Sequence, residues 1–98
     1  MRQRLKERTL GHMRRNSYAV WWKEEDGPRH VGKLEVALFH ALLSGKGSKR
    51  LAVPLDAITT VECRPGEVRL NRRNGGFLRI GSLDAPGTLR ELAHVLGA

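Results

Sequence analysis

The last third of the chain, residues 67–97, constrains the fold most strongly. In residues 67–73, Val68 and Leu70 alternate with polar residues, and in residues 77–83 Leu78 and Ile80 do so again, with Asn74-Gly75-Gly76 between the two runs. Alternation with a period of two is typical of a strand with one buried face, and Asn and Gly accept the positive φ angles of a tight turn. The segment therefore predicts a β-hairpin.

After Leu83 the spacing of apolar residues lengthens to that of a helix, which predicts an amphipathic helix directly behind the hairpin. Asp84 could cap its start, and the spacing of Thr88 and Glu91 fits a capping box equally well, so both starts stay open. Gly97 supplies a left-handed stop. The predicted apolar face consists of Leu89, Leu92, Ala93 and Leu96.

Five further runs with strand character precede the hairpin. They cover residues 17–23, 29–37, 39–44, 51–55 and 58–64. The connections between them are too short for a crossover helix, so neighbouring strands are expected to be antiparallel. The alternation predicts that Leu34, Val36 and Leu38 point inward, and Pro54 marks an edge, a bend or the end of its strand.

The sequence thus predicts a mainly β fold, a strongly bent antiparallel sheet of seven strands with one C-terminal α-helix over its open end. The 98 residues suffice for one domain, and 40% hydrophobic against 29% charged residues suits a folded protein. No apolar run approaches the roughly 20 residues of a membrane-spanning helix, and a cytoplasmic location is expected. The single cysteine, Cys63, excludes a disulfide within the chain.

The charge is unevenly distributed. Residues 1–16 contain six of the 18 Lys and Arg and one of the ten Asp and Glu, so they carry +5 of the net charge of +8. We interpret them as a basic N-terminal arm that could contact an anionic partner. The arm is either partly helical or, because Gly11-His12-Met13 resembles the junction that a cloning vector leaves, partly vector-derived.

Two segments resemble a known family. Val31-Gly32-Lys33-Leu34-Glu35-Val36 and Val53-Pro54-Leu55-Asp56-Ala57-Ile58-Thr59-Thr60-Val61-Glu62 are similar to the G-x-L-x-V and V-P-L-x-x-I-x-x-V-E patterns of bacterial pleckstrin-homology-like (PH-like) domains and the related GRAM domains. The Arg-rich hairpin and the helix around Leu89-Arg90-Glu91-Leu92 complete the resemblance. It implies a PH-like domain over residues 17–98, folded as a bent antiparallel barrel of seven strands that the helix caps.

The sequence departs from the family at its best-known ligand site. Many eukaryotic PH domains bind phosphoinositide headgroups through basic residues on the first strand, the loop after it and the second strand. In this chain that loop reads Glu24-Glu25-Asp26. Three carboxylates repel a phosphorylated headgroup unless Lys23, Arg29 and His30 outweigh them.

Four arginines of the hairpin form the candidate site for an anion or a lipid: Arg69, Arg72, Arg73 and Arg79. Arg69 and Arg79 are expected on the outer face of the hairpin, with the other two near its turn. Clustered guanidinium groups suit phosphate or carboxylate. The alternative is that these charges only keep exposed strands from pairing with another chain.

Three aromatic residues of the first strand, Tyr18, Trp21 and Trp22, are the candidate protein-contact residues. Trp21 and Trp22 point to opposite faces of a strand, so one is expected in the core and the other exposed or covered by a partner or by the arm. An exposed Trp is a typical hot spot of a protein interface.

Catalysis and metal binding find no support in the sequence. The serines lack the context of a nucleophile, and residues 45–50 are basic and Gly-rich but lack the P-loop spacing, so they predict a hairpin loop. No catalytic residue, metal or cofactor is therefore predicted. None of the four histidines has the spacing of metal ligands; they are His12, His30, His40 and His94.

The favoured function is a non-enzymatic binding or scaffold module that acts through protein–protein contacts and forms homo-oligomers. Peripheral binding to anionic membrane lipid, through the arm and the hairpin, is the alternative. Nucleic-acid binding is less favoured, because outside Trp21 and Trp22 the sequence does not interleave aromatic with basic residues.

Overall fold

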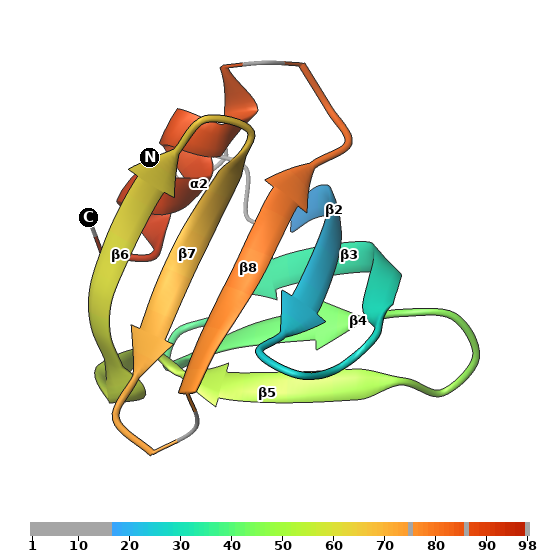
Figure 1. Ribbon diagram of the computed structural model, residues 1–98, viewed down its shortest axis with the longest axis horizontal. Coiled ribbons are helices and arrows are strands. Elements are labelled where there is room, and N and C mark those ends of the chain that lie inside the picture. Colours follow the sequence, from blue (N-terminus) through green and yellow to red (C-terminus); the bar gives the residue numbers. More distant parts are fainter. Residues whose placement is uncertain (1–16, 75, 86, 98) are drawn as a thin grey trace, which may run out of the picture.

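The computed structural model describes residues 17–74, 76–85 and 87–97, and the predicted arm lies outside them. The described residues form strands, one short 3-10 helix and one α-helix (Figure 1). In chain order the elements are β2 (Ser17–Glu24), β3 (Arg29–Val36), β4 (His40–Ser44), β5 (Arg50–Pro54), η2 (Leu55–Ala57), β6 (Ile58–Arg64), β7 (Glu67–Arg72), β8 (Gly76–Ser82) and α2 (Thr88–Val95).

The strands form one seven-stranded antiparallel sheet in the order β5-β4-β3-β2-β8-β7-β6. Consecutive strands pair with each other from β2 through β5, and again from β6 through β8. The pairing of β2 with β8 joins these two groups into one sheet. The sheet curls, so that in Figure 1 β4 and β5 run at a steep angle to β6 and β7. The predicted mainly β fold class, seven antiparallel strands followed by a helix, is confirmed.

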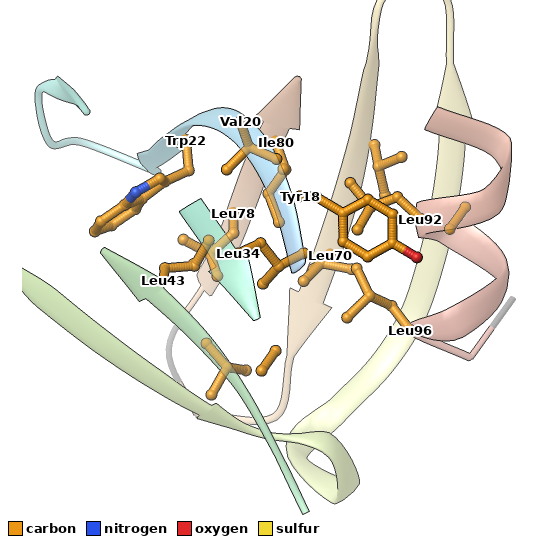
Figure 2. Packing of buried hydrophobic residues seen from close by; sticks show 14 residues of the cluster. Tyr18, Val20, Trp22, Leu34, Leu43, Leu70, Leu78, Ile80, Leu92 and Leu96 are labelled. Carbon is orange, nitrogen blue, oxygen red and sulfur yellow. The ribbon is translucent and has the colours of Figure 1, made fainter. Parts of the chain in front are cut away.

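The core lies on the inner face of the curled sheet. In β2 the side chains of Tyr18, Val20 and Trp22 are buried and those between them are less so, because successive side chains of a strand point to opposite faces. Figure 2 shows Trp22 at one end of the cluster and Tyr18, with Leu92, at the other. The other buried members are Leu34, Ala41, Leu43, Val53, Val68, Leu70, Leu78, Ile80, Ala93 and Leu96.

The helix α2 packs on the inner side of β6, β7 and β8 (Figure 1). It begins at Thr88, and Gly97 follows it with a φ of 121°, which confirms the predicted stop. The Tyr18 hydroxyl donates a hydrogen bond of 2.9 Å to Glu91 Oε2, so β2 holds the helix as well. α2 has only eight residues, and no helix in the described part of the chain is long and apolar enough to span a bilayer.

The prediction that Leu38 points inward was wrong. Leu34 is buried and Val36 half-buried, but the Leu38 side chain is 81% exposed. The strand β3 ends at Val36, so the alternation of strand side chains does not extend into the turn. Phe39, predicted to start the next strand, also belongs to this turn and is 70% exposed, because β4 begins at His40.

Candidate functional site

Four basic residues form a row across the outer face of the sheet. The strand register aligns Arg69 on β7 with Arg79 on β8, Arg79 with Lys23 on β2, and Lys23 with Arg29 on β3. Because neighbouring strands lie about 4.8 Å apart, the backbone of the row spans about 15 Å. We call Arg69, Arg79, Lys23 and Arg29 the cationic row.

Two guanidinium groups of the cationic row rest on aromatic rings. Arg29 Cζ lies 4.2 Å from the centroid of the Trp21 ring, and Arg69 Cζ lies 3.7 Å from that of the Phe77 ring. Arg79 Cζ is 5.9 Å from the Trp21 ring. The face of an aromatic ring attracts a cation and orients it, while the N–H groups at the edge of the guanidinium can still bind an anion.

A glycine makes room for the Trp21 indole. Gly81 of β8 is the register partner of Trp21 in β2. A Cβ atom at Gly81 would overlap the indole, with Trp21 Cζ2 only 2.6 Å away. The missing side chain therefore lets the ring lie against the sheet between Arg29 and Arg79.

Two carboxylates beside the row are already paired with arginines. Arg79 donates to Glu67 through Nε, at 3.1 Å to both carboxylate oxygens, and through a terminal nitrogen at 2.8 Å. Arg64 donates to Glu62 at 3.1 and 2.7 Å. Within the described part of the chain, three members of the row have no ion pair: Lys23, Arg29 and Arg69.

The pairing of Glu67 predicts a contribution to stability that depends on pH. The hydrogen bond from Arg79 lowers the pKa of Glu67 below its ordinary value of 4.5. The contribution is therefore present above that value and is lost as the pH falls through the lower pKa of the folded state. We expect Glu67→Gln to cost about 0.5–1 kcal/mol at neutral pH and almost nothing near pH 2, measured as urea unfolding.

Glu35→Gln is the matched control for this experiment. It removes the same charge from the same outer face, and Glu35 has no ion pair with a described residue. If Glu67→Gln lowered the free energy of unfolding equally at all pH values, or if Glu35→Gln had the same effect, the pair of Glu67 and Arg79 would not be the source of the pH dependence.

The other two hairpin arginines lie near the turn between β7 and β8. A terminal nitrogen of Arg72 is 3.9 Å from Glu24 Oε2, and its Nε donates to the Gly76 carbonyl at 3.3 Å. Arg73 donates to the backbone carbonyl of Asp56 in η2 at 2.8 Å. Of the predicted set Arg69, Arg72, Arg73 and Arg79, the structure thus brings together Arg69 and Arg79.

Among the predicted protein-contact residues, Trp21 is the one on the outer face. Tyr18 and Trp22 belong to the core, and the expected division of the two tryptophans between opposite faces is confirmed. Trp22 Nε1 donates to the Ser44 carbonyl at 2.9 Å, and its ring centroid lies 4.4 Å from that of His30. A partner can therefore reach Trp21 but not Trp22 in this conformation.

The turn between β3 and β4 forms a second candidate surface. Its backbone is held by hydrogen bonds from Ala37 N to His40 O, at 2.8 Å, and from Leu55 N to Phe39 O, at 2.9 Å. The exposed side chains of the turn are therefore presented by an ordered backbone. We call Leu38, Phe39, Pro54 and Leu55 the apolar end; together with His40 and Asp56 they line a hollow of about 370 Å³.

The sequence pointed to Lys23 and Arg29 only as cations that could outweigh the acidic turn, and did not group them with Arg69 and Arg79; Phe77 was not predicted as a site residue. The short turn between β2 and β3 is the signal that places Lys23 opposite Arg29. For metal ions, no suitable group of three His, Cys, Asp or Glu residues exists in residues 17–74, 76–85 and 87–97.

Comparisons with known proteins add no assignment to this geometry. No protein-family model matches the chain, and no curated protein matches it.

Proposed function

We propose that this protein is a non-enzymatic binding module with a PH-like fold, which acts through protein–protein contacts and self-associates through the apolar end. The observation that carries the proposal is the exposure of two adjacent large apolar side chains, Leu38 at 81% and Phe39 at 70%. Burying such surface is worth about 25 cal/mol per Å², and grouped exposed apolar side chains are typical of interfaces. The order of seven strands and a C-terminal helix supports the PH-like assignment.

The ordered turn favours association. Because the hydrogen bonds from Ala37 N to His40 O and from Leu55 N to Phe39 O hold its backbone, the turn loses little conformational entropy when a partner covers it. The hollow next to Phe39 offers a matching depression for an apolar side chain. A protruding apolar side chain and a hollow on the same surface suit an interface between two identical copies, because each copy can insert its side chain into the hollow of the other.

A second copy of the chain is the partner that the surrounding charges favour. A twofold interface needs both halves of every complementary pair on the same surface. The apolar end is flanked by Asp56 and by Arg73, which donates to the Asp56 carbonyl. In a twofold pair, Arg73 of one copy can face Asp56 of the other. The cationic row lacks this property, because it would meet its own positive charge.

The test replaces both exposed side chains. We expect the full chain to be an oligomer in solution, and Leu38→Ser together with Phe39→Ser to make it a monomer, since the variant loses the apolar contact of each copy. Light scattering over a range of protein concentrations measures the mass. Circular dichroism checks that the variant is folded, as expected for two side chains outside the core.

Leu83→Ser is the control, because Leu83 is also exposed, at 52%, but follows β8 instead of lying at the apolar end. It should leave the oligomer intact. A monomeric wild-type chain, or an oligomer that survives in the double variant, would overturn the proposal. A chain that starts at Met13 should remain oligomeric, and a monomer there would assign the assembly to the preceding residues instead.

A further inference from the structure

We infer that the cationic row, with Trp21 and Phe77, is a binding site for single-stranded nucleic acid. The site lies at the end of β3 away from the apolar end, since Arg29 begins that strand and the apolar turn follows Val36. The cationic row shares no residue with the apolar end, and its Arg29 end lies far from it along β3.

The first requirement of such a site is a line of positive charge. Four cations stand at consecutive positions across β7, β8, β2 and β3. Within the described part of the chain, Lys23 Nζ donates only to the backbone carbonyl of Glu25, at 3.4 Å, and Arg29 and Arg69 have no ion pair within 4 Å. In addition to the hydrogen bonds from their own arginine partners, the nearby charge of Arg69 helps to lower the pKa of both Glu62 and Glu67. Phosphates that follow one another along a single strand can each meet a cation of this line.

The second requirement is the presence of flat groups within that line. The Trp21 and Phe77 rings each carry a guanidinium, at 4.2 Å from Arg29 and 3.7 Å from Arg69. An unpaired base can stack on an aromatic ring or on the plane of an arginine. Because the rings already orient Arg29 and Arg69, binding orders few additional side chains.

The Arg69 side chain is positioned by its contact with an aromatic ring and not by a hydrogen bond from its Nε. Arg69 Nε is buried and has no hydrogen-bond partner within the described residues. Its guanidinium instead lies over the Phe77 ring. A buried donor without an acceptor costs free energy, which the contact of the guanidinium with the Phe77 ring offsets in part.

The distribution of acidic residues favours a single strand over a flat anionic surface. Glu62, Glu67 and Glu35 lie on the same outer face as the row, and Glu62, the register partner of Arg69, stands just beyond its β7 end. A membrane covers the whole face and meets these carboxylates together with the cations. A single strand that follows the row across four strands contacts mainly Arg69, Arg79, Lys23 and Arg29.

The test measures binding of a fluorescein-labelled deoxythymidine oligomer of about 12 nucleotides by fluorescence anisotropy, at about 0.05 to 0.2 M salt. Lys23→Gln combined with Arg29→Gln should weaken binding by more than about tenfold at the lowest salt and flatten the slope of log K against log salt by about 1.4. The matched control, Arg90→Gln combined with Lys46→Gln, removes the same charge from exposed positions of α2 and of the β4–β5 loop. Equal weakening by both double variants would overturn the assignment, because it would show an effect of net charge alone.

A second readout reports on the site itself. Trp21 and Trp22 are the two tryptophans of the chain, and Trp22 is buried. Bound oligomer should quench the tryptophan fluorescence of the wild-type chain, and this quenching should disappear in Trp21→Phe, which keeps a ring under Arg29. Quenching that persists in Trp21→Phe would place the ligand elsewhere.

Three further ligands distinguish the source of the negative charge. Duplex DNA of the same length should bind more weakly than the single strand, because its bases cannot stack on the site. Poly-glutamate should compete poorly with the labelled oligomer for the protein. Any binding to vesicles that contain phosphatidylserine should be the same for the wild-type chain and for the variant with Lys23→Gln and Arg29→Gln. Equal affinity for the duplex, efficient competition by poly-glutamate, or row-dependent vesicle binding would each overturn the assignment to single-stranded nucleic acid.

Discussion

Trp22→Ala is expected to lower the free energy of unfolding by about 3–5 kcal/mol, the range for removing a large buried aromatic side chain. Trp22 is fully buried at one end of the core, and its indole nitrogen donates to the Ser44 carbonyl. The substitution leaves a cavity and an unsatisfied carbonyl next to His30. Since domains of this size have a stability of about 5–15 kcal/mol, the variant should be close to unfolding at 37 °C, as urea denaturation will show.

The neighbouring tryptophan provides the control. Trp21→Ala removes the same side chain from the outer face, where it contacts Arg29 and lies against Gly81. We expect a cost of about 1–2 kcal/mol from the lost cation–π contact and partial burial. Similar costs for the two substitutions would contradict the placement of Trp22 inside and Trp21 outside.

Gly32→Ala is expected to cost about 2–4 kcal/mol, although it adds a single methyl group. A Cβ atom at Gly32 would overlap the Ser44 carbonyl oxygen and lie 2.7 Å from the Ser44 carbonyl carbon. Backbone atoms cannot turn away as a side-chain end can, so either β4 shifts or the hydrogen bond from Trp22 is lost. Hydrogen exchange of the Trp22 indole N–H, followed by NMR, should become faster in this variant.

Gly27→Ala is the matched control for Gly32→Ala. Its added Cβ would meet Glu24 Cβ at 3.7 Å, an ordinary contact, and Gly27 does not have a positive φ. We expect a change within about 0.5 kcal/mol and unchanged protection of the Trp22 indole. If Gly32→Ala behaved like Gly27→Ala, the close approach of Ser44 to β3 would be wrong.

The cationic row and the apolar end differ in how far the sequence predicted them. The alternation in the hairpin predicted Arg69 and Arg79 as site residues on its outer face, and the structure places both in the cationic row. Lys23 and Arg29 were weighed only against the three carboxylates of the acidic turn that they flank, and Phe77, which follows the glycine turn, was not predicted as a site residue. The apolar end was missed because the strand pattern was extended to Leu38, beyond the true end of β3.

The sequence by itself determined the number and order of the strands and the C-terminal helix, although not the short 3-10 helix η2. Alternation in residues 67–73 and 77–83, the helical spacing after Leu83 and the glycine stop at Gly97 all depend on interactions between near neighbours in the chain. The same local rules predicted that the two tryptophans would separate to opposite faces. Each of these features is confirmed in the structure.

Only the tertiary structure decided which residues meet on the surface. The pairing of β2 with β8 brings Lys23 opposite Arg79 and Trp21 opposite Gly81, although each pair is far apart in the chain. No local pattern specifies that register, because it depends on how the whole sheet curls around Tyr18, Trp22 and the helix. The fold class could therefore be predicted from periodicity, whereas the cationic row follows from the register of strands that the closed core holds together.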